Sequence, residues 1–240
     1  MEPIDRLIAE LPQFHAWPDG RPANWSVATA VLRYIHSQLE PDMHTLETGA
    51  GQTTVAFAMA GTAHICITPD RSQADRIRAY CADRGIDCAV KFIHESSDIA
   101  LASGRDIPGT LDFVLIDGAH RFPFPILDWH YTQQRLPVGG VVVVDDFLMP
   151  SVRILHDFLM GEDEWELIKK FQVTSFFRRK RATENMWDWA DQKINEPHLK
   201  LQAQRLAASR RSERAARLLR RWWGANRAGA EHAANGRKGM

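Results

Sequence analysis

The chain has few cysteines, no long apolar run and no net charge, and each of these absences argues against a class of protein. Among 240 residues only Cys66, Cys81 and Cys88 are cysteines, and no two of them form a Cys-x-x-Cys pair. This count and spacing argue against a zinc ribbon or a disulfide framework. No segment approaches the ~18 consecutive apolar residues of a membrane-spanning helix, and residues 1–10 lack the basic-then-apolar pattern of a secretion signal. We therefore expect a cytoplasmic protein.

Charge is balanced overall but unevenly divided along the chain. Residues 182–240 carry a net charge of +6, and residues 1–181 carry the compensating −6. The difference predicts three regions: an N-terminal helical lead over residues 1–40, a central domain over 41–181, and a basic helical extension over 182–240. The last part of this extension, from Gly224 to Met240, is rich in Ala, Gly and Asn and is expected to be disordered.

Short apolar runs alternate with longer amphipathic segments from residue 43 onward, which is the pattern of a parallel sheet with crossover helices. Strands are expected at 43–48, 62–68, 87–93, 111–117 and 140–145, and helices at 26–39, 52–60, 71–84, 97–103, 122–135 and 151–160. The final two apolar runs, Trp165–Phe171 and Thr174–Arg179, lie too close together for a parallel crossover. They predict an antiparallel hairpin at the end of the sheet.

Polar residues close four of the expected strands. These strand ends are Glu47-Thr48-Gly49-Ala50-Gly51, Glu95–Asp98, Asp117–His120 and Asp145-Asp146. Ligands bind beyond the carboxyl ends of strands in this kind of sheet, so the four segments are expected to face one crevice.

The glycine loop after the first strand suits close contact between backbone and ligand. Gly49 and Gly51 carry no Cβ, and the helix that follows begins with unpaired N–H groups. The loop alone is weak evidence, because an ordinary strand-to-helix turn has similar glycines. A nicotinamide cofactor is disfavoured because its fingerprint requires a third glycine where Thr54 stands. Glu47, just before the loop, suits a ligand with a cationic group instead.

Three motifs in order resemble those of class I S-adenosylmethionine-dependent methyltransferases, particularly the branch of catechol O-methyltransferase and the sugar or macrolide O-methyltransferases. The motifs are Leu46–Thr54, Phe113–His120 and Leu136–Asp146. The resemblance covers about residues 25–180. It implies a Rossmann-like three-layer α/β fold with a seven-stranded, mostly parallel sheet whose last strand is antiparallel. It also implies S-adenosyl-L-methionine as the cofactor and a small molecule as the methyl acceptor.

The same resemblance assigns the cofactor site. The first motif would line the methionine and ribose parts of the cofactor, and Ser97 with Asp98 would lie near the adenine. The family usually ends its second strand with an acid that accepts the ribose hydroxyls, but this chain has Cys66 and Thr68 there. Asp70 either takes that role from a shifted position or caps the next helix. The full set of expected cofactor-binding residues is Glu47, Thr48, Gly49, Ala50, Gly51, Thr53, Thr54, Asp70, Ser97, Asp98 and Asp117.

Asp117, Asp145 and Asp146 form a second group of candidate residues. Carboxylate oxygens suit Mg²⁺ or another divalent cation, and the catechol-type enzymes hold a metal at these positions, although there an amide stands in place of Asp146. His120 stands where those enzymes carry a lysine base. A histidine, with an ordinary pKa of about 6.5, accepts a proton near neutral pH. In the simpler interpretation, Asp117 contacts only cofactor or substrate, the aspartate pair caps the next element and His120 orients the substrate.

The favoured function is metal-assisted methylation of a small-molecule hydroxyl, in which the cation acidifies the hydroxyl and His120, beside Asp117, removes its proton. Three alternatives stay open: a metal-independent O- or N-methyltransferase, a non-catalytic cofactor-binding protein of the same fold, and a nucleic-acid methyltransferase. The remaining histidines considered, His15, His36 and His130, are interpreted as helix or surface residues.

The basic extension predicts an amphipathic helix. Arg210, Arg214 and Arg217 fall on one side at helical spacing, and Leu218 and Trp222 fall on another. Packing against the central domain, or against a second copy in a homodimer, is the favoured interpretation. Contact with nucleic acid or an anionic membrane is less favoured.

Overall fold

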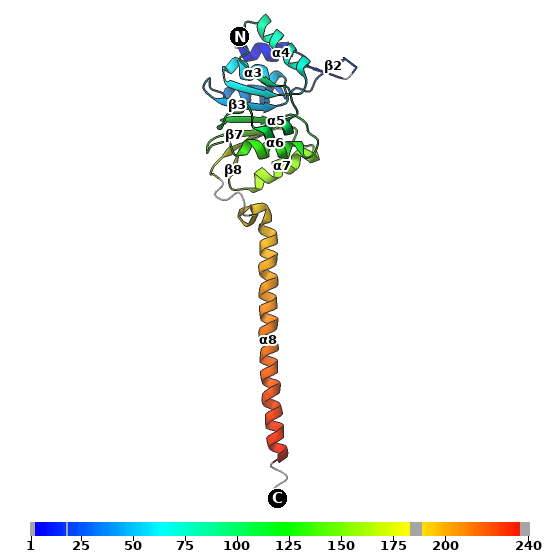
Figure 1. Cartoon of the computed structure of the whole chain (residues 1–240), viewed down its shortest axis with the longest axis vertical. Coiled ribbons are helices and arrows are strands. Elements are labelled where there is room, and N and C mark those ends of the chain that lie inside the picture. The colour runs from blue at the N-terminus through cyan, green and yellow to red at the C-terminus, as the bar shows by residue number, and fades with distance from the viewer. Residues whose placement is uncertain (1–2, 18, 183–188, 236–240) are drawn as a thin grey trace. The chain divides into compact units, whose positions relative to one another are not determined.

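The computed structural model describes residues 3–17, 19–182 and 189–235, and for residues 219–235 it describes the backbone only. The chain divides into two units, Met1–Glu184 and Asn185–Met240. The first unit is an α/β sandwich (Figure 1). The second contains the short helices η1 (Trp189–Asp191) and η2 (Lys193–Asn195) and the long helix α8 (Glu196–Asn235).

A seven-stranded sheet with the order β5-β4-β3-β6-β7-β9-β8 forms the centre of the first unit. Strands β3 to β7 pair in parallel, and β9 lies antiparallel to both β7 and β8. The predicted fold is thereby confirmed, including the terminal hairpin. From β3 the chain continues to β4 and β5 on one side of the sheet, and it then crosses to β6 on the other side of β3. The strand order therefore reverses between β3 and β6, and the crevice typical of such sheets lies beyond the carboxyl ends of these two strands. The strands are β3 (His44–Thr48), β4 (Ala63–Ile67), β5 (Lys91–Ile93), β6 (Phe113–Ile116), β7 (Val141–Val144), β8 (Trp165–Lys170) and β9 (Ser175–Arg179).

Alternate strand residues build two hydrophobic cores, because successive side chains of a strand point to opposite faces. Phe113 and Leu115 join the core that contains α1 to α4, whereas Val114 and Ile116 join the core that contains α5 to α7. The sheet is therefore covered on both faces, which explains why its central strands read as unbroken apolar runs. The first-face helices are α1 (Pro3–Glu10), α2 (Thr29–Ser37), α3 (Gln52–Ala60) and α4 (Arg71–Asp83), and the second-face helices are α5 (Ser97–Ser103), α6 (Phe124–Gln133) and α7 (Pro150–Gly161).

The first forty residues are more regular than the sequence predicted. Helix α1 was not expected, yet its Ile4 and Leu7 are buried in the first core. At its end Glu10 accepts hydrogen bonds from the Tyr80 hydroxyl at 2.7 Å and from Arg84 Nε at 2.5 Å. Hydrogen bonds from Tyr80, Arg6 and Arg84 lower the pKa of Glu10 to about 2. Helix α1 is thus tied to α4 by both apolar and charged contacts.

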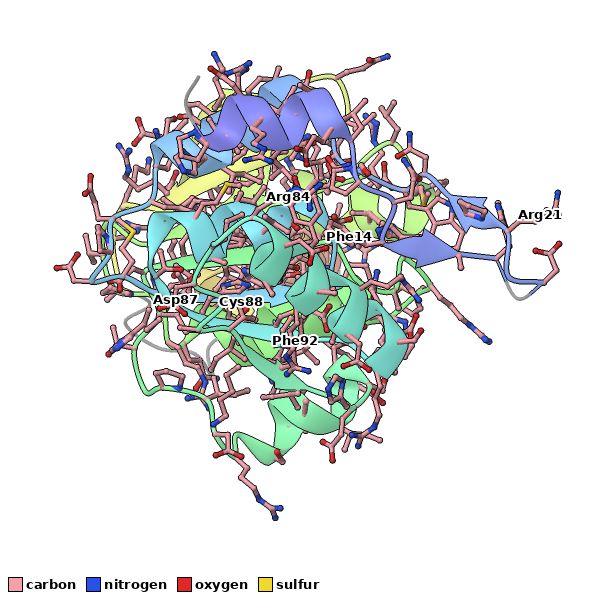
Figure 2. The ribbon with its side chains drawn as sticks, turned by 90° about the horizontal axis from the view of Figure 1, so that it is seen from above. Phe14, Arg21, Arg84, Asp87, Cys88 and Phe92 are labelled. Carbon is pink, nitrogen blue, oxygen red and sulfur yellow. The ribbon has the colours of Figure 1, made fainter. Side chains whose placement is uncertain are left out.

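A small hairpin separates α1 from α2. It consists of β1 (His15–Ala16) and β2 (Pro22–Ala23), which pair antiparallel. Figure 2 shows the hairpin projecting from the body of the unit, with Phe14 at its base and Arg21 near its outer end. Helix α2 begins at Thr29, three residues later than predicted, because residues 24–28 run in an extended form along the carboxyl edge of the sheet.

The C-terminal extension is helical for longer than predicted. Helix α8 continues to Asn235, so the expected disorder from Gly224 onward is wrong for residues 224–235, and residues 236–240 lie outside the described part. Alanine is the strongest helix former, and the alanines of this segment offset its two glycines. Among the described residues, no helix has both the length and the apolar character needed to cross a membrane.

Candidate active site

A cavity of about 670 Å³ lies beyond the carboxyl ends of the parallel strands. All four polar strand ends reach it, as their common position in the sheet predicted. The N-terminal segment supplies a further wall with His15 and residues 24–28. The contributors from the strand ends are Thr48, Gly49, Ala50, Ser96, Ser97, Asp117, Gly118, Ala119, His120, Asp145 and Asp146.

Two glycines allow the loops after β3 and β6 to touch. Gly49 has a φ of +89°, and a Cβ placed on it would lie 2.3 Å from the carbonyl oxygen of Asp117. A Cβ on Gly118 would lie 3.1 Å from side-chain atoms of Thr48. Any side chain at residue 49 would therefore push the two loops apart. The glycine motif sets the shape of the cavity at the point where the strand order reverses.

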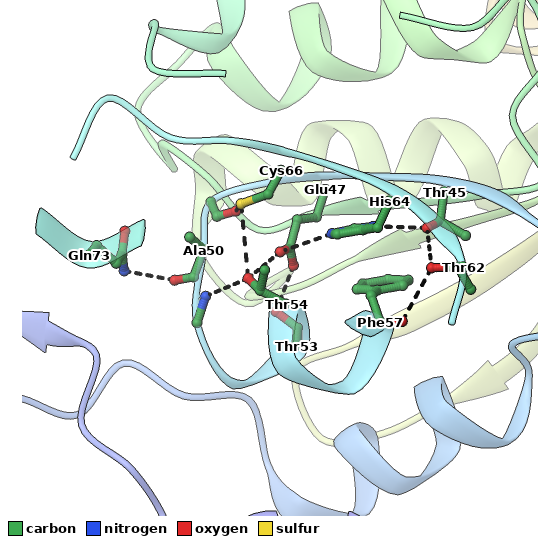
Figure 3. Close-up of polar contacts among 12 residues, drawn as sticks. Thr45, Glu47, Ala50, Thr53, Thr54, Phe57, Thr62, His64, Cys66 and Gln73 are labelled. Carbon is green, nitrogen blue, oxygen red and sulfur yellow. Dashed lines mark hydrogen bonds and ion pairs between the residues drawn. The ribbon is translucent and has the colours of Figure 1, made fainter. Parts of the chain in front are cut away.

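Glu47 is buried and does not line the cavity, and Figure 3 shows its carboxylate contacting residues inside the protein. Its carboxylate accepts hydrogen bonds from the hydroxyls of Thr53, at 2.7 Å, and Thr54. The Thr54 oxygen in turn accepts the Gly51 N–H at 3.0 Å. Glu47, Thr53 and Thr54, which were predicted to contact the cofactor, do not line the cavity, because their polar atoms hold the start of α3 together.

A histidine on the neighbouring strand completes this buried network. His64 Nε2 lies 3.2 Å from the Glu47 carboxylate, and both side chains are almost fully excluded from solvent. The ring stacks on Phe57, and its Nδ1 lies 2.8 Å from the Thr45 hydroxyl, which contacts Thr62. Glu47, the acid that precedes the glycine loop, therefore pairs with a protein side chain, His64. Polar residues alternate along the buried strands β3 and β4, and this alternation is the sequence feature that indicates the pairing of Glu47 with His64.

The end of β4 differs from the family pattern in the way the sequence indicated. Asp70 accepts the Gln73 N–H at 3.1 Å and the Ser72 hydroxyl at 2.7 Å, and it does not line the cavity. Of the two roles left open for Asp70, the structure shows the helix cap. The Thr68 hydroxyl donates to Gln73 Oε1 at 3.1 Å. The cavity is lined here by Ile67, Pro69 and Gln73 instead.

Two other predicted cofactor residues also lie outside the cavity lining. Asp98 accepts a hydrogen bond from the Ser96 hydroxyl at the start of α5, and its neighbour Ser97 faces the cavity in its place. Gly51 is the N-cap residue of α3, and the His15 ring lies close to it. Unlike Ala50, Gly51 does not line the cavity. The cavity therefore receives the first half of the glycine motif rather than all of it.

His120 lies between two carboxylates at the cavity. Its Nε2 is 3.6 Å from Asp117 Oδ1, and its Nδ1 is 3.6 Å from Asp146 Oδ2. Asp146 has a φ of +54°, an uncommon backbone conformation that tends to occur at functional positions. Burial raises the pKa of Asp117 well above its usual range, and the nearby charges of Asp145, Asp146 and Glu47 add to this shift. The three neighbouring carboxylates therefore favour a positively charged group beside them.

The three aspartates do not converge as metal ligands. The Asp145 carboxylate accepts a hydrogen bond from the Thr174 hydroxyl, while Asp117 and Asp146 flank His120. Within the described part of the chain, no three His, Cys, Asp or Glu side chains are grouped so that they could hold a metal ion. The arrangement does not fit the metal site that the resemblance implied.

Asp128 is a buried acid that the sequence analysis missed. It lies in α6 and is only 1% exposed. Burial raises its pKa to about 6, and the nearby hydroxyls of Ser97 and Thr48 oppose that shift. Neither carboxylate oxygen of Asp128 has a hydrogen-bond partner among the described residues. Ser97 and Thr48 both line the cavity, so Asp128 lies close to the cavity wall.

Residues 46–147, which run from within β3 through β7 and contain all three motifs, match a family model described as a methyltransferase domain. This segment of the chain is similar to methyltransferase domains. The matched region contains every strand-end residue of the cavity. A comparison of the chain with curated protein sequences finds no match.

Solved structures share the fold of this chain at low sequence identity. One is the O-methyltransferase TomG from Streptomyces achromogenes, involved in tomaymycin synthesis and solved in complex with SAM: 20% identity, 65% of this chain and 82% of TomG covered, TM-score 0.52. Another is cofactor-bound Rv0187 from MTB, with 13% identity, 67% and 84% coverage and a TM-score of 0.56. A methyltransferase from Geobacter sulfurreducens has 16% identity, 65% and 81% coverage and a TM-score of 0.52.

Proposed function

We propose that the protein is an S-adenosylmethionine-dependent methyltransferase that methylates a hydroxyl oxygen of a small molecule, with His120 as the general base and without a metal ion. The observation that carries this proposal is the position of His120, which lines the cavity between Asp117 and Asp146. A base flanked by two carboxylates can accept a proton and be stabilised in its charged form.

The chemistry of the proposed reaction is a methyl transfer with loss of one proton. When bound, S-adenosylmethionine supplies a methyl group on a positively charged sulfur. His120 takes the acceptor's hydroxyl proton as the oxygen lone pair forms the new C–O bond, and the pair from the broken C–S bond stays on sulfur. Asp117 and Asp146 stabilise the imidazolium and hold the ring in place. The cavity walls hold the two reactants close together, which removes much of the entropic cost of the reaction.

The proposal differs from the metal-assisted mechanism first expected. A divalent cation would require several oxygen donors to converge on one point, whereas Asp145 is directed to Thr174 and the other two aspartates flank His120. The donor set therefore supports proton removal by His120 alone.

The cofactor and acceptor are assigned to different parts of the cavity. Of the predicted cofactor-binding residues, those that line the cavity remain candidates: Thr48, Gly49, Ala50, Ser97 and Asp117. The acceptor is assigned to the side formed by residues 24–28, Phe124 and Met149, where Trp25 is 53% exposed. An exposed tryptophan at the rim favours an acceptor with a flat or apolar portion.

A chelator experiment tests this proposal. Transfer of a labelled methyl group from S-adenosylmethionine to a panel of small hydroxyl compounds is measured with and without excess EDTA. We expect turnover with at least one compound and no loss of rate in the chelator. Activity that disappears in EDTA and returns with Mg²⁺ would show that the metal-assisted mechanism is the correct one. Turnover only with amines would replace the oxygen acceptor by nitrogen.

A further inference from the structure

Residues 12–14 lead into the projecting hairpin, with Phe14 at its base (Figure 2), and they make hydrogen bonds to α3 and α4. Arg76 of α4 donates to the carbonyl oxygen of Phe14 through Nε at 2.9 Å and through Nη2 at 2.7 Å. The Gln52 side chain donates to the Pro12 carbonyl at 3.3 Å. These hydrogen bonds fix the backbone before His15, and strand pairing with Ala23 of β2 fixes the backbone of His15 itself.

His15 lies over the end of the glycine loop. Its Nε2 is 3.2 Å from the position that a Cβ on Gly51 would occupy, and the residue lines the cavity. Its ring also contacts that of Trp25, with 5.4 Å between centroids. The prediction that His15 is a helix or surface residue is therefore wrong. The sequence offered no signal for this position, because the contact joins segments that are distant along the chain.

Gln73 determines which nitrogen of His15 carries the proton. Gln73 Nε2 lies 2.7 Å from the Ala50 carbonyl oxygen, which can only accept, and 2.8 Å from His15 Nδ1. The Gln73 Oε1 accepts the Thr68 hydroxyl at 3.1 Å, so the amide orientation is consistent on both sides. Because Gln73 donates to His15 Nδ1, that nitrogen must be unprotonated, and the proton lies on Nε2.

The Nε2–H group of His15 is left for a ligand. Burial lowers the pKa of His15, and the positive charge of Arg76 adds to this effect, so the ring is neutral with a single proton. Among the described residues, none accepts a hydrogen bond from this nitrogen. The N–H therefore lies beside the start of α3, where the helix dipole and the Arg76 guanidinium also favour a negative group.

We propose that His15 is a cofactor-binding residue whose Nε2–H donates to the carboxylate of the methionyl part of S-adenosylmethionine. The inference rests on the proposed function, because it requires that cofactor to lie along Gly49 and Ala50. Gln73 bridges His15 and Ala50, so the N-terminal hairpin and the glycine loop form one side of the cofactor site. A carboxylate is the group chosen, since it is the only anionic part of this cofactor.

Calorimetry with two ligands that differ only in the carboxylate tests the proposal. The ligands are S-adenosylhomocysteine and its decarboxylated analogue, and the variant is His15→Phe, which keeps a flat ring beside Trp25 but has no N–H. We expect His15→Phe to weaken S-adenosylhomocysteine binding by about 10- to 100-fold, the range for a hydrogen bond to a charged group. Binding of the decarboxylated analogue should change by less than about 3-fold on the same scale.

Two further variants control the experiment. His15→Gln retains an amide N–H and should recover part of the lost affinity for S-adenosylhomocysteine alone. His130→Phe, at an exposed position of α6, should leave both affinities unchanged. Equal losses for the two ligands in His15→Phe, or no loss for either, would overturn the role of His15 while leaving the proposed function standing. Wild-type protein that binds neither ligand would overturn both.

Discussion

Two histidine–carboxylate clusters lie in the α/β unit, and they differ in access rather than in chemical type. Glu47 and His64 have side chains that are 1% and 0% exposed, and threonine hydroxyls take up their remaining polar atoms. Asp117 and His120 have side chains that are 21% and 22% exposed at the cavity. The cluster of Glu47 and His64 can stabilise the fold but is closed to a substrate. The cluster of Asp117 and His120 has polar atoms that a substrate can contact.

The distances in the two clusters support the same distinction. The buried carboxylate of Glu47 makes close hydrogen bonds, including one of 2.7 Å to Thr53. His120 lies 3.6 Å from each of its carboxylate neighbours, which is longer than a hydrogen bond. Loose contacts of this kind often tighten only when substrate binds. Substitutions in the two clusters should therefore affect different properties of the protein.

The largest expected effect is on catalysis. His120→Ala should lower kcat by about 10²- to 10⁴-fold, the usual contribution of a general base, with little change in cofactor affinity. The measurement is methyl transfer to the acceptor that gives turnover, together with calorimetry of S-adenosylhomocysteine binding. His130→Ala serves as the matched histidine control. A kcat within about 3-fold of wild type would mean that the cavity cluster is not the catalytic one.

The buried cluster should respond through stability. Glu47→Ala removes one partner of a buried pair and leaves His64 without its carboxylate, so the free energy of unfolding should fall by about 3–5 kcal/mol. Asp146→Ala, at the more open cluster, should cost less than about 1 kcal/mol. Urea denaturation of both variants provides the measurement. Similar losses of unfolding free energy in Glu47→Ala and Asp146→Ala would contradict the distinction between a buried cluster and an accessible one.

Asp128 lies between these extremes, because it is buried yet lies near two cavity residues. Its folded-state pKa of about 6 exceeds the usual value, so the folded protein binds this proton more tightly than the unfolded chain does. The stabilisation is full below about pH 4 and is lost as pH rises through about 6. Asp128→Asn should therefore be more stable than wild type by about 3 kcal/mol at pH 8, with the difference vanishing near pH 4.

Thermal denaturation across this pH range measures the Asp128 effect. Asp112→Asn is not a suitable control, since Asp112 accepts the backbone N–H of His44, whereas the exposed Asp75→Asn changes only a surface charge. A stability difference that is independent of pH would show that Asp128 is not titrating in the folded protein.

The smallest expected effect concerns the cysteines. Burial raises the pKa of Cys66, with a further contribution from Glu47, and its thiol donates to the Gly49 carbonyl. A hydrogen bond from Cys81 lowers the pKa of Cys88 to about 7. Iodoacetamide at pH 7.5 should therefore modify Cys88 first, and its rate should fall about 20-fold at pH 5.5. Peptide mass spectrometry measures both sites. Early modification of Cys66 would show that the buried network opens readily.

Much of the fold was predictable because the pattern of apolar residues depends on burial. Val141–Val144 reads as a fully buried strand because helices cover both faces of the sheet. The convergence of the strand ends that carry Gly49 and Asp117 on one crevice was likewise expected. Helix α1 was missed because only Ile4 and Leu7 mark its buried side over a short segment.

The direction of individual side chains could not be predicted in the same way. Glu47 was expected to face the cofactor, but His64 on the next strand offers it a partner inside the protein. Asp70 had two possible roles, and the nearby N–H of Gln73 selects the cap. These outcomes depend on atoms that are far apart in sequence or on a choice between two partners of similar chemistry.

By itself, the sequence determined the alternation of strands and helices, the glycine loop and the order of the three motifs, because these follow from local backbone chemistry and from the periodicity of burial. Tertiary structure alone decided which acids are sealed in the protein and which face the cavity. It also brought His15 to the glycine loop through Gln73, 58 residues away. A side chain's role here depends on its partners and its access to ligand, and both are properties of the packed structure.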